Sequence, residues 1–336
     1  MKKKVVVIGG GTGGFLVCSG LKAYADEIDI SVIVGVSDNG GSTGKLRDEF
    51  GRLPMGDLRM VLVALADESL IDSASLRELF LYRFNKGGEG LQGHNFGNLL
   101  LTALSDVVGS EEKAIAVVSR MLGVKGRVLP VAHSMTTLVA TYADGVVVKG
   151  ETHIDEPTPD RDMHCIVDFG LESFVQESAE VREALQTADM IVLGPGDLYT
   201  SLLAACVVGD VAQLMRDSKA PFVYISNLVS KFGQTTGYDT ARYVSEIVKY
   251  VGRTPDAFLI NTTPLPEELI ARYAHTGECP VVDAGCGSIP TECIRGDFLA
   301  SEEVVTKAGD VLKRSLIRHD AHKLSAALMD YLRKAH

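Results

Sequence analysis

The sequence predicts a three-layer α/β fold around one mostly parallel sheet, with an antiparallel hairpin extension. Short apolar runs rich in β-branched residues alternate with helical segments, which is typical of βαβ units. The runs are continuous rather than alternating in polarity, which indicates strands covered on both faces. With 336 residues, 46% of them hydrophobic, the chain can bury one large core or two smaller ones. We expect a single domain over residues 1–336, because no linker or repeat interrupts the pattern.

The expected elements follow in order along the chain. The parallel strands are the apolar runs at residues 5–8, 30–36, 190–193, 222–225 and 258–260. Residues 57–123 are expected to be mostly helical, because their apolar side chains recur with helical spacing. The hairpin extension, at about 127–168, has two β-rich runs around an Asp144-Gly145 turn. The last helix places Leu324, Ala327, Leu328 and Tyr331 on one face.

The composition excludes several classes of partner. The formal net charge of −11 would repel nucleic acid and anionic membranes, so neither is expected as the main partner. No segment approaches the roughly 20 apolar residues that cross a bilayer, so membrane insertion is not expected. The six cysteines, including Cys279, Cys286 and Cys293 at every seventh residue, lack metal-ligand spacing. They are predicted to be thiols in a reducing compartment, hence in the cytoplasm.

A glycine-rich loop follows the first strand. Gly9, Gly11 and Gly14 match the pattern GxGxxG directly before a helix. Glycines let the backbone approach a phosphate, and the helix N-terminus supplies free N–H donors and partial positive charge. The predicted ligand-binding residues of this loop are Gly10, Gly11, Thr12 and Gly13. The structural alternative is a tight turn without a ligand.

A second polar loop, residues 37–45, follows the second strand. It differs from the Walker A pattern, because Asn39 stands where the first glycine is needed and Leu46 follows the lysine. Two glycine loops on successive strands indicate one or two ligands with more than one anionic group. The predicted contacts are Asp38, Asn39, Gly40, Gly41, Ser42, Thr43 and Lys45.

Asp57 stands at the start of the next expected helix, which would run to Ala66. Its structural role would be an N-cap. Together with Asp38 it would instead hold a divalent cation that bridges to phosphate, or accept hydrogen bonds from sugar hydroxyls. Four basic residues nearby, Lys45, Arg47, Arg52 and Arg59, either offset this charge or form a solvated helix face. Arg59 is counted among the ligand-binding residues.

Three further segments complete the predicted site. His94 and Asn98 lie in a glycine-containing segment that opens a helix, which is costly unless the segment serves a site. The loop after the third strand contributes Gly194, Pro195, Gly196, Thr200 and Ser201. Asn227 follows the next strand, and Tyr238 beyond it would either stack on a base or pack in the core.

These spaced motifs together resemble the CofD-like superfamily, and most closely its YvcK branch, the gluconeogenesis-factor proteins. They lie at residues 9–13, 38–47, 56–59, 93–98, 193–201 and 227–238, and the likeness runs from about residue 4 to about residue 330. The resemblance implies a Rossmann-like fold in a cytoplasmic bacterial protein. It also implies binding of UDP-sugars such as UDP-N-acetylglucosamine, and a link to growth on gluconeogenic carbon sources, cell shape and wall synthesis.

The CofD branch is a transferase, which moves a 2-phospholactyl group from a nucleotide diphosphate donor to a deazaflavin alcohol. Its Mg²⁺ is held by two aspartates, to which Asp38 and Asp57 correspond. Many relatives carry a second acid where this chain has Asn39, and the glycine loop here is of the YvcK kind. Mg²⁺ is the one cofactor that the resemblance suggests, and the uncharged Asn39 would weaken its site.

Three functions compete at this point. The leading hypothesis is a regulatory protein, expected to be a homo-oligomer, that binds the diphosphate of a nucleotide sugar through its three loops. The second is a Mg²⁺-dependent transferase of phosphorus-containing groups. The third is an NAD(P)-dependent oxidoreductase, suggested by the first glycine loop with Asp38, although the second loop would then be unexplained. No Ser-His-Asp pattern assigns a catalytic residue, and His319 and His322 are interpreted as structural or surface groups.

Overall fold

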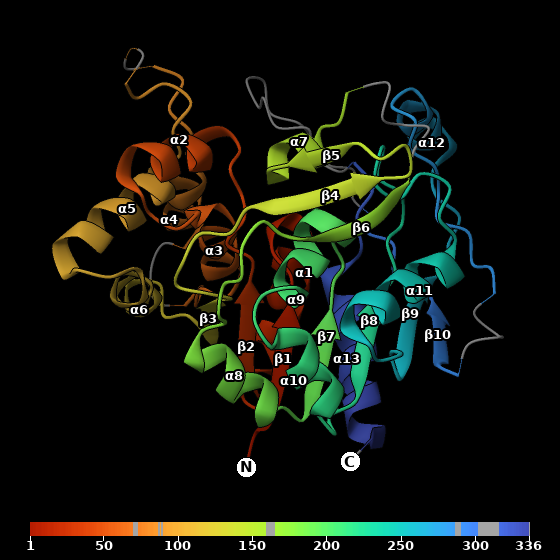
Figure 1. Ribbon diagram of the computed structural model, residues 1–336. Helices are drawn as coiled ribbons and strands as arrows, with labels where there is room; N and C mark the ends of the chain where they lie inside the picture. The colour runs from red at the N-terminus through yellow and green to blue at the C-terminus, as the bar shows by residue number, and fades with distance from the viewer. Residues whose placement is uncertain are drawn as a thin grey trace.

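A seven-stranded parallel sheet forms the centre of the molecule (Figure 1). The computed structural model describes residues 1–69, 73–86, 88, 90–158, 165–285, 290–301 and 316–335. The strand order is β10-β9-β8-β7-β1-β2-β3, and every neighbouring pair is parallel. The strands are β1 (Lys3–Ile8), β2 (Ile28–Val34), β3 (Arg127–Pro130), β7 (Met190–Leu193), β8 (Phe222–Ile225), β9 (Ala257–Asn261) and β10 (Glu292–Gly296). The predicted fold class is confirmed, and the structure adds β10 at one edge. Residues 127–130 were expected in the hairpin extension, but they form β3 at the other edge of the parallel sheet, where they pair with β2.

The central strands are buried on both faces, as their continuous apolar runs predict. All four residues of β7 and of β8 are buried, and so are the last four of β1. Two layers of helices cover them (Figure 1). One layer contains α1 (Gly11–Leu21), α3 (Met55–Ala64) and α13 (Ala321–Ala335), and the other contains α8 (Ala179–Gln186), α10 (Val211–Asp217) and α11 (Thr240–Val251). Removal of this apolar surface from water is the main force that holds the layers together.

The chain changes direction across the sheet at β1. It passes from β1 through α1 to β2 on one side, whereas β7 lies on the other side and leads outward to β8 and β9. In open parallel sheets, ligands bind outside the carboxyl ends of the strands at such a switch point. The first glycine loop follows β1 and the third follows β7, so these two loops flank the switch point.

A group of helices lies beside the β2–β3 edge (Figure 1). It contains α2 (Gly41–Phe50), α4 (Ser73–Leu81), α5 (Phe96–Val108) and α6 (Glu111–Met121). Together with α3, these helices confirm the prediction for residues 57–123. The helix expected from Asp57 begins at Met55 and ends at Ala64.

A small antiparallel sheet lies across the carboxyl ends of the parallel strands (Figure 1). The predicted hairpin is confirmed as β4 (Leu138–Tyr142) and β5 (Val147–Lys149), and β6 (Ile166–Leu171) adds a third strand in the order β5-β4-β6. The short helix α7 (Glu151–Asp155) directly follows β5. This sheet is separate from the seven-stranded one, so it covers the edge rather than widening the main sheet.

The remaining described elements connect these layers. They are the 3₁₀ turn η1 (Lys22–Tyr24), the π-helical turn η3 (Leu198–Leu203), α9 (Ala204–Cys206) and α12 (Glu267–Ala274). No single helix among the described residues is long and apolar enough to cross a membrane, and the one pair of that combined length, Leu198–Cys206 with Val211–Asp217, is bent by 74°.

The cysteine prediction needs one correction. Four cysteines are free thiols, as expected: Cys18, Cys165, Cys206 and Cys279. Cys293 is disulfide-bonded, so the prediction of thiols throughout is wrong. Cys286 lies outside the described residues.

Gly20 provides a test of the α1–α13 packing. A β-carbon there would lie 2.1 Å from the carbonyl oxygen of Ala321 and 2.9 Å from the β-carbon of Ser325. Alanine inside a helix normally stabilises by roughly 1 kcal/mol relative to glycine. Gly20→Ala is expected to do the opposite and to lower the free energy of unfolding by about 1–3 kcal/mol, because the helices must separate. Urea denaturation measures this, with Gly170→Ala in β6, where a β-carbon has no neighbour within 4 Å, as the control. A stabilised Gly20→Ala protein would contradict the described packing.

Candidate functional site

Glycines bring the loops at the carboxyl edge into direct contact. A β-carbon on Gly13 would lie 1.9 Å from the carbonyl oxygen of Pro195, so the loops after β1 and β7 touch across the switch point. A β-carbon on Gly56 would lie 3.1 Å from Asp38 Oδ2, so the loop after β2 approaches the start of α3. Only glycine fits such close approaches of loop to loop. The first, second and third predicted loops therefore form one site.

Asp57 lies over the beginning of α1. It belongs to the first turn of α3, whose N-cap is Pro54, so the predicted N-cap role of Asp57 is wrong. A β-carbon on Gly10 would lie 2.1 Å from Asp57 Oδ2, and the N–H of Gly11 donates a hydrogen bond to the Asp57 carboxylate. Asp57 therefore occupies the N-terminus of α1, where the positive end of a helix attracts an anion.

The second loop turns back on itself at Asp38. Asp38 Oδ1 accepts a hydrogen bond from the N–H of Gly40 at 2.8 Å, and the hydroxyl of Thr43 also bonds to this carboxylate. Gly40 is the N-cap of α2 and offers no side chain, while Gly41 has φ +49° and open space around its α-carbon. The first turn of α2 therefore begins without a side-chain cap directly beside Asp38.

His94 and Asn98 support this turn from the start of α5. Ser42 Oγ lies 3.3 Å from His94 Nδ1 and accepts a hydrogen bond from the N–H of Asn95 at 3.1 Å. Asn98 Nδ2 donates to Thr43 Oγ1 at 3.3 Å. All of these side chains are buried. The two residues predicted from the segment before α5 thus hold the second loop in place.

Helix α7 is attached to the loops of the site by polar contacts. Asn39 Oδ1 accepts hydrogen bonds from the N–H and the hydroxyl of Thr152 at 2.9 and 2.8 Å. Asp155 Oδ1 accepts from Thr200 Oγ1 in the third loop at 3.1 Å. It also accepts from Gln234 Nε2 at 3.1 Å. The small sheet and α7 are therefore attached both to the loop after β2 and to the loop after β7.

Negative charge dominates this site. Five carboxylates from four segments interact electrostatically there: Asp38, Asp57, Glu151, Asp155 and Asp197. Among the described residues, Lys231 places its ammonium group within this cluster. Its Nζ lies 3.1 Å from Asp155 Oδ2 and 3.7 Å from Asp197 Oδ2. Arg47, whose guanidinium donates to the carbonyl of Ser37 at 3.2 Å, also attracts Asp38.

Burial is the largest cause of the raised pKa values of Asp38, Asp57, Glu151 and Asp197. Burial, and then the charge of Asp38, raise the pKa of Asp57 to about 7. Burial, followed by Asp38 and Asp155, raises the pKa of Glu151 to about 9. Burial also raises the pKa of Asp197, although Lys231 opposes this. Such perturbed carboxyl groups, clustered at a switch point, are typical of a functional site.

Two buried amide oxygens beside the cluster have no hydrogen-bond partner within the described part of the chain. They are Asn98 Oδ1 and Gln234 Oε1, and both side chains are at least 98% buried. Their amide nitrogens already bond to Thr43 and to Asp155, which fixes which way each oxygen points. A buried acceptor without a donor is costly, so each oxygen marks a place for a donor from water or a ligand.

Several predicted residues take other roles. Lys45 is exposed on α2. Arg59 is buried and donates to the carbonyl of Phe80 at 3.1 Å, so it anchors α4 to α3 while its charge lowers the pKa of Asp57. Arg52 pairs with Asp106, outside the site. Tyr238 is 7% exposed and packs edge-on against a neighbouring ring, as a core residue does.

His319 and His322 fit the structural interpretation. His319 is buried, and burial lowers its pKa to about 4. The backbone N–H of His322 donates to Asp320 Oδ1 at 2.8 Å, at the start of α13.

Five residues of the site were not assigned from the sequence: Glu151, Asp155, Asp197, Lys231 and Gln234. Asp197 lies inside the third loop, so its place after a strand was the available signal. Glu151 and Asp155 are four residues apart and share one face of a single helical turn, but nothing in that spacing places the turn above a distant loop.

A cavity of about 190 Å³ lies beside the third loop, at the carboxyl ends of β8 and β9. Its walls include Leu228, Ile260, Pro264 and Leu265, and asparagine side chains lie at its edge. Asn227 Nδ2 donates to the carbonyl of Gly196 at 2.8 Å and so connects the cavity to the third loop. Serine, threonine and asparagine residues line the same cavity, so it offers a ligand hydrogen-bonding groups as well as apolar contacts.

The raised pKa of Glu151 predicts how stability depends on pH. A folded-state pKa near 9 lies above the ordinary value of 4.5, so the folded state binds more protons between these limits. The free-energy cost of ionising Glu151 in the folded state is absent below about pH 4.5 and complete above about pH 9. This group therefore makes the free energy of unfolding fall as pH rises between these values. Glu151→Gln is therefore expected to stabilise the ligand-free protein at high pH and to change little at low pH, measured by urea midpoints. An equal change in stability at low and high pH would contradict the raised pKa of Glu151. So would the same pH-dependent change in the exposed Glu172→Gln control.

Comparison with known proteins now identifies the family. A family model described as 2-phospho-L-lactate transferase CofD matches residues 5–299. The chain belongs to the CofD family. Within it, the similar proteins carry the name gluconeogenesis factor. That of Bacillus subtilis is 35% identical over 335 residues, covering 99% of each chain. That of Listeria innocua is 38% identical over 339 residues, covering 98% of this chain and 96% of the other.

A solved structure has the same architecture. The crystal structure of a UPF0052 family member from Bacillus halodurans aligns with a TM-score of 0.87 at 33% sequence identity. The alignment covers 98% of this chain and 99% of the other. The two proteins thus share the α/β fold over nearly their whole length, and the expected resemblance is confirmed.

Proposed function

We propose that this CofD-family protein is a regulatory protein that binds a nucleotide sugar of the UDP-N-acetylglucosamine type, with a divalent cation between protein and diphosphate. The observation that carries the proposal is the carboxylate cluster at the switch point between β1 and β7. Five acids with few basic neighbours would repel a bare diphosphate. A cation between them and the phosphates removes this conflict.

Mg²⁺ fits the residues that are present. It prefers oxygen ligands and is usually held by one or two carboxylates plus substrate phosphates. Asp38 and Asp57 offer such carboxylates, and their mutual repulsion, seen in the raised pKa of Asp57, is the condition that a bound cation relieves. We assign these two residues as its ligands. The ion would supply charge neutralisation at the diphosphate.

The loops divide the rest of the ligand between them. The Gly11 N–H is already bonded to Asp57, so the diphosphate reaches the first loop through the cation. Free N–H groups remain at the start of α2, where Gly41 is open to a ligand. The sugar hydroxyls would donate to Asn98 Oδ1 and Gln234 Oε1. The base would occupy the cavity at β8 and β9, because the ring of Tyr238 is packed away.

The regulatory assignment rests on the relatives and on the site itself. The relatives are named for gluconeogenesis, and the proposal extends to this chain a role in growth on gluconeogenic carbon sources and in cell shape and wall synthesis. If α7 closes over the bound ligand, the regulator would have two states, one open and ligand-free and one closed and ligand-bound. Cytoplasmic location and assembly into homo-oligomers belong to the same proposal.

A second candidate is a Mg²⁺-dependent transferase of phosphorus-containing groups. The observation in its favour is Glu151, whose pKa near 9 keeps it protonated at neutral pH above the loops. A protonated carboxyl there would donate a proton to a leaving group. The oxidoreductase is not supported, because Asp57 occupies the helix N-terminus where a dinucleotide would place its pyrophosphate.

A thermal-shift screen of nucleotides and nucleotide sugars tests the proposed function. UDP-N-acetylglucosamine is expected to raise the melting temperature in the presence of Mg²⁺, since a ligand at 100 times its Kd stabilises by about 2.7 kcal/mol. Turnover of a phosphodiester donor in the same samples would favour the transferase. A response to NADH alone, with none to nucleotide sugars, would overturn both.

A further inference from the structure

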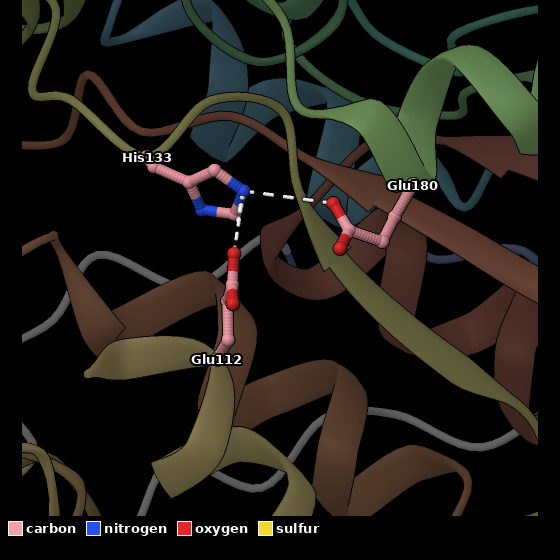
Figure 2. A group of neighbouring side chains, drawn as sticks. All are labelled: Glu112, His133 and Glu180. Atoms are coloured by element: carbon pink, nitrogen blue, oxygen red, sulfur yellow. Dashed lines mark ion pairs between the residues drawn. The ribbon is translucent and has the colours of Figure 1, made fainter. Parts of the chain in front are cut away.

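A second group of convergent side chains lies apart from the carboxylate cluster. It contains Glu112 in the first turn of α6, His133 in the loop after β3 and Glu180 in the first turn of α8 (Figure 2). His133 Nε2 lies 2.7 Å from Glu112 Oε1 and 3.5 Å from Glu180 Oε2. One potential ligand atom from each residue lies within 4.8 Å of the others. The proposed nucleotide site uses none of them.

The hydrogen bonding within this group is incomplete. The single hydrogen that His133 Nε2 can carry is directed to Glu112, the nearer carboxylate. Glu180 Oε2 has almost no exposed surface, and apart from its 3.5 Å contact with His133 Nε2 it accepts no hydrogen bond from the described residues. Even with a charged imidazole, two carboxylates against one cation leave a net negative charge. A divalent cation between the three groups would use the lone pairs of all of them.

The backbone presents these side chains from fixed positions. The N–H of Ser178, the N-cap of α8, donates to the carbonyl of Val131 at 2.9 Å, and its hydroxyl donates to the carbonyl of Pro130 at 3.1 Å. These bonds attach the beginning of α8 to the end of β3, two residues before His133. Ser110 caps α6 through the N–H of Lys113. The backbone segments that carry the three side chains are therefore held close together before a metal arrives, which favours binding.

We propose that Glu112, His133 and Glu180 form a binding site for a divalent transition-metal ion of the Zn²⁺ class. Imidazole nitrogen favours Zn²⁺ and its neighbours over Mg²⁺ and Ca²⁺, and Zn²⁺ accepts histidine together with glutamate ligands. Side chains that are 42–50% exposed leave the remaining coordination position to water. The ion links α6, α8 and the end of β3, which is an edge strand of the main sheet. This site is independent of the proposed function.

Calorimetric titration of the chelator-treated full chain with Zn²⁺ tests the site. The titrations use the Asp57→Asn background, so that the carboxylate cluster contributes less, and Co²⁺ absorption reports nitrogen and oxygen coordination. The expected result is one Zn²⁺ site that excess Mg²⁺ does not displace. Its affinity is expected to fall at least about ten-fold in His133→Ala and in Glu180→Gln.

Glu183→Gln is the matched control, because Glu183 lies on the same helix, is exposed and pairs with Arg127 at 3.3 Å. The Glu183→Gln protein is expected to bind Zn²⁺ with the same affinity as its Asp57→Asn parent. Zn²⁺ should also raise the melting temperature, and His133→Ala should abolish that rise. Equal Zn²⁺ affinity with and without His133 would overturn the proposal. So would a destabilised His133→Ala protein whose parent does not respond to Zn²⁺, which would show an ion pair only.

Discussion

Asp57→Asn is expected to lower Mg²⁺-supported affinity for the nucleotide sugar by at least about 100-fold. Loss of residues that merely support metal ligands already costs 10–100-fold, and Asp57 is proposed as a ligand itself. Asparagine keeps the oxygen that accepts the Gly11 hydrogen bond, so the start of α1 should remain intact. Calorimetry with and without Mg²⁺ measures the change.

The same variant should be more stable than the parent when no ligand is present. Burial and Asp38 raise the pKa of Asp57 from 3.8 to about 7, so ionising it in the folded state costs free energy above about pH 7. Asparagine removes this cost, and the melting temperature at alkaline pH should rise. Asp48→Asn is the control, because Asp48 is exposed on α2. It should change neither the Mg²⁺-supported ligand affinity nor the melting temperature. An Asp57→Asn protein that binds normally, or that is destabilised at alkaline pH, would exclude the metal-ligand role.

Lys231→Met is expected to lower the free energy of unfolding by about 2–3 kcal/mol. Removing one partner from a buried ion pair costs about 3–5 kcal/mol, and the value is reduced here because Lys231 is 26% exposed. Without it, Asp155 and Asp197 face each other with no ammonium group between them. Their repulsion should release α7 from the third loop, so ligand affinity should fall together with stability.

Lys149→Met provides the control for this result. Lys149 pairs with Glu172 at 2.7 Å, but both side chains are about half exposed, so the loss should stay below about 1 kcal/mol. Proteolysis across residues 150–158 gives a second measurement, because a released α7 should be cut faster in Lys231→Met. Equal stability of the two lysine variants would show that Lys231 does not hold the acidic cluster together.

The sequence was sufficient for the central layers and not for the edges. β7 and β8 are recognisable because every residue is apolar and buried. β10 mixes charged and small residues and β3 ends in proline, as edge strands often do, so neither has the continuous apolar pattern. β6 was missed for a different reason. Only two of its six residues are buried, so it lacks a continuous apolar run.

The site was predictable where its residues follow strands and not where distant segments meet. Glycine loops after β1, β2 and β7 are visible in sequence, because parallel strands end at one edge. The contact of Asn39 with Thr152 joins residues 113 positions apart, and no local pattern announces it. Asp57 shows the same limit, since its place over Gly10 depends on the packing of α3 against α1. The charges on α7 were therefore missed, although the proposed cation rests partly on them.

Calorimetric titration of the full chain with UDP-N-acetylglucosamine, in excess Mg²⁺ and again in excess chelator, tests whether the site binds a nucleotide sugar through a divalent cation. We expect a saturable heat of binding with Mg²⁺ and its loss with chelator, because the carboxylate cluster would repel a diphosphate without a cation. Absence of heat at millimolar ligand with Mg²⁺ would contradict nucleotide-sugar binding. Undiminished binding in chelator would contradict the cation between the aspartates and the diphosphate.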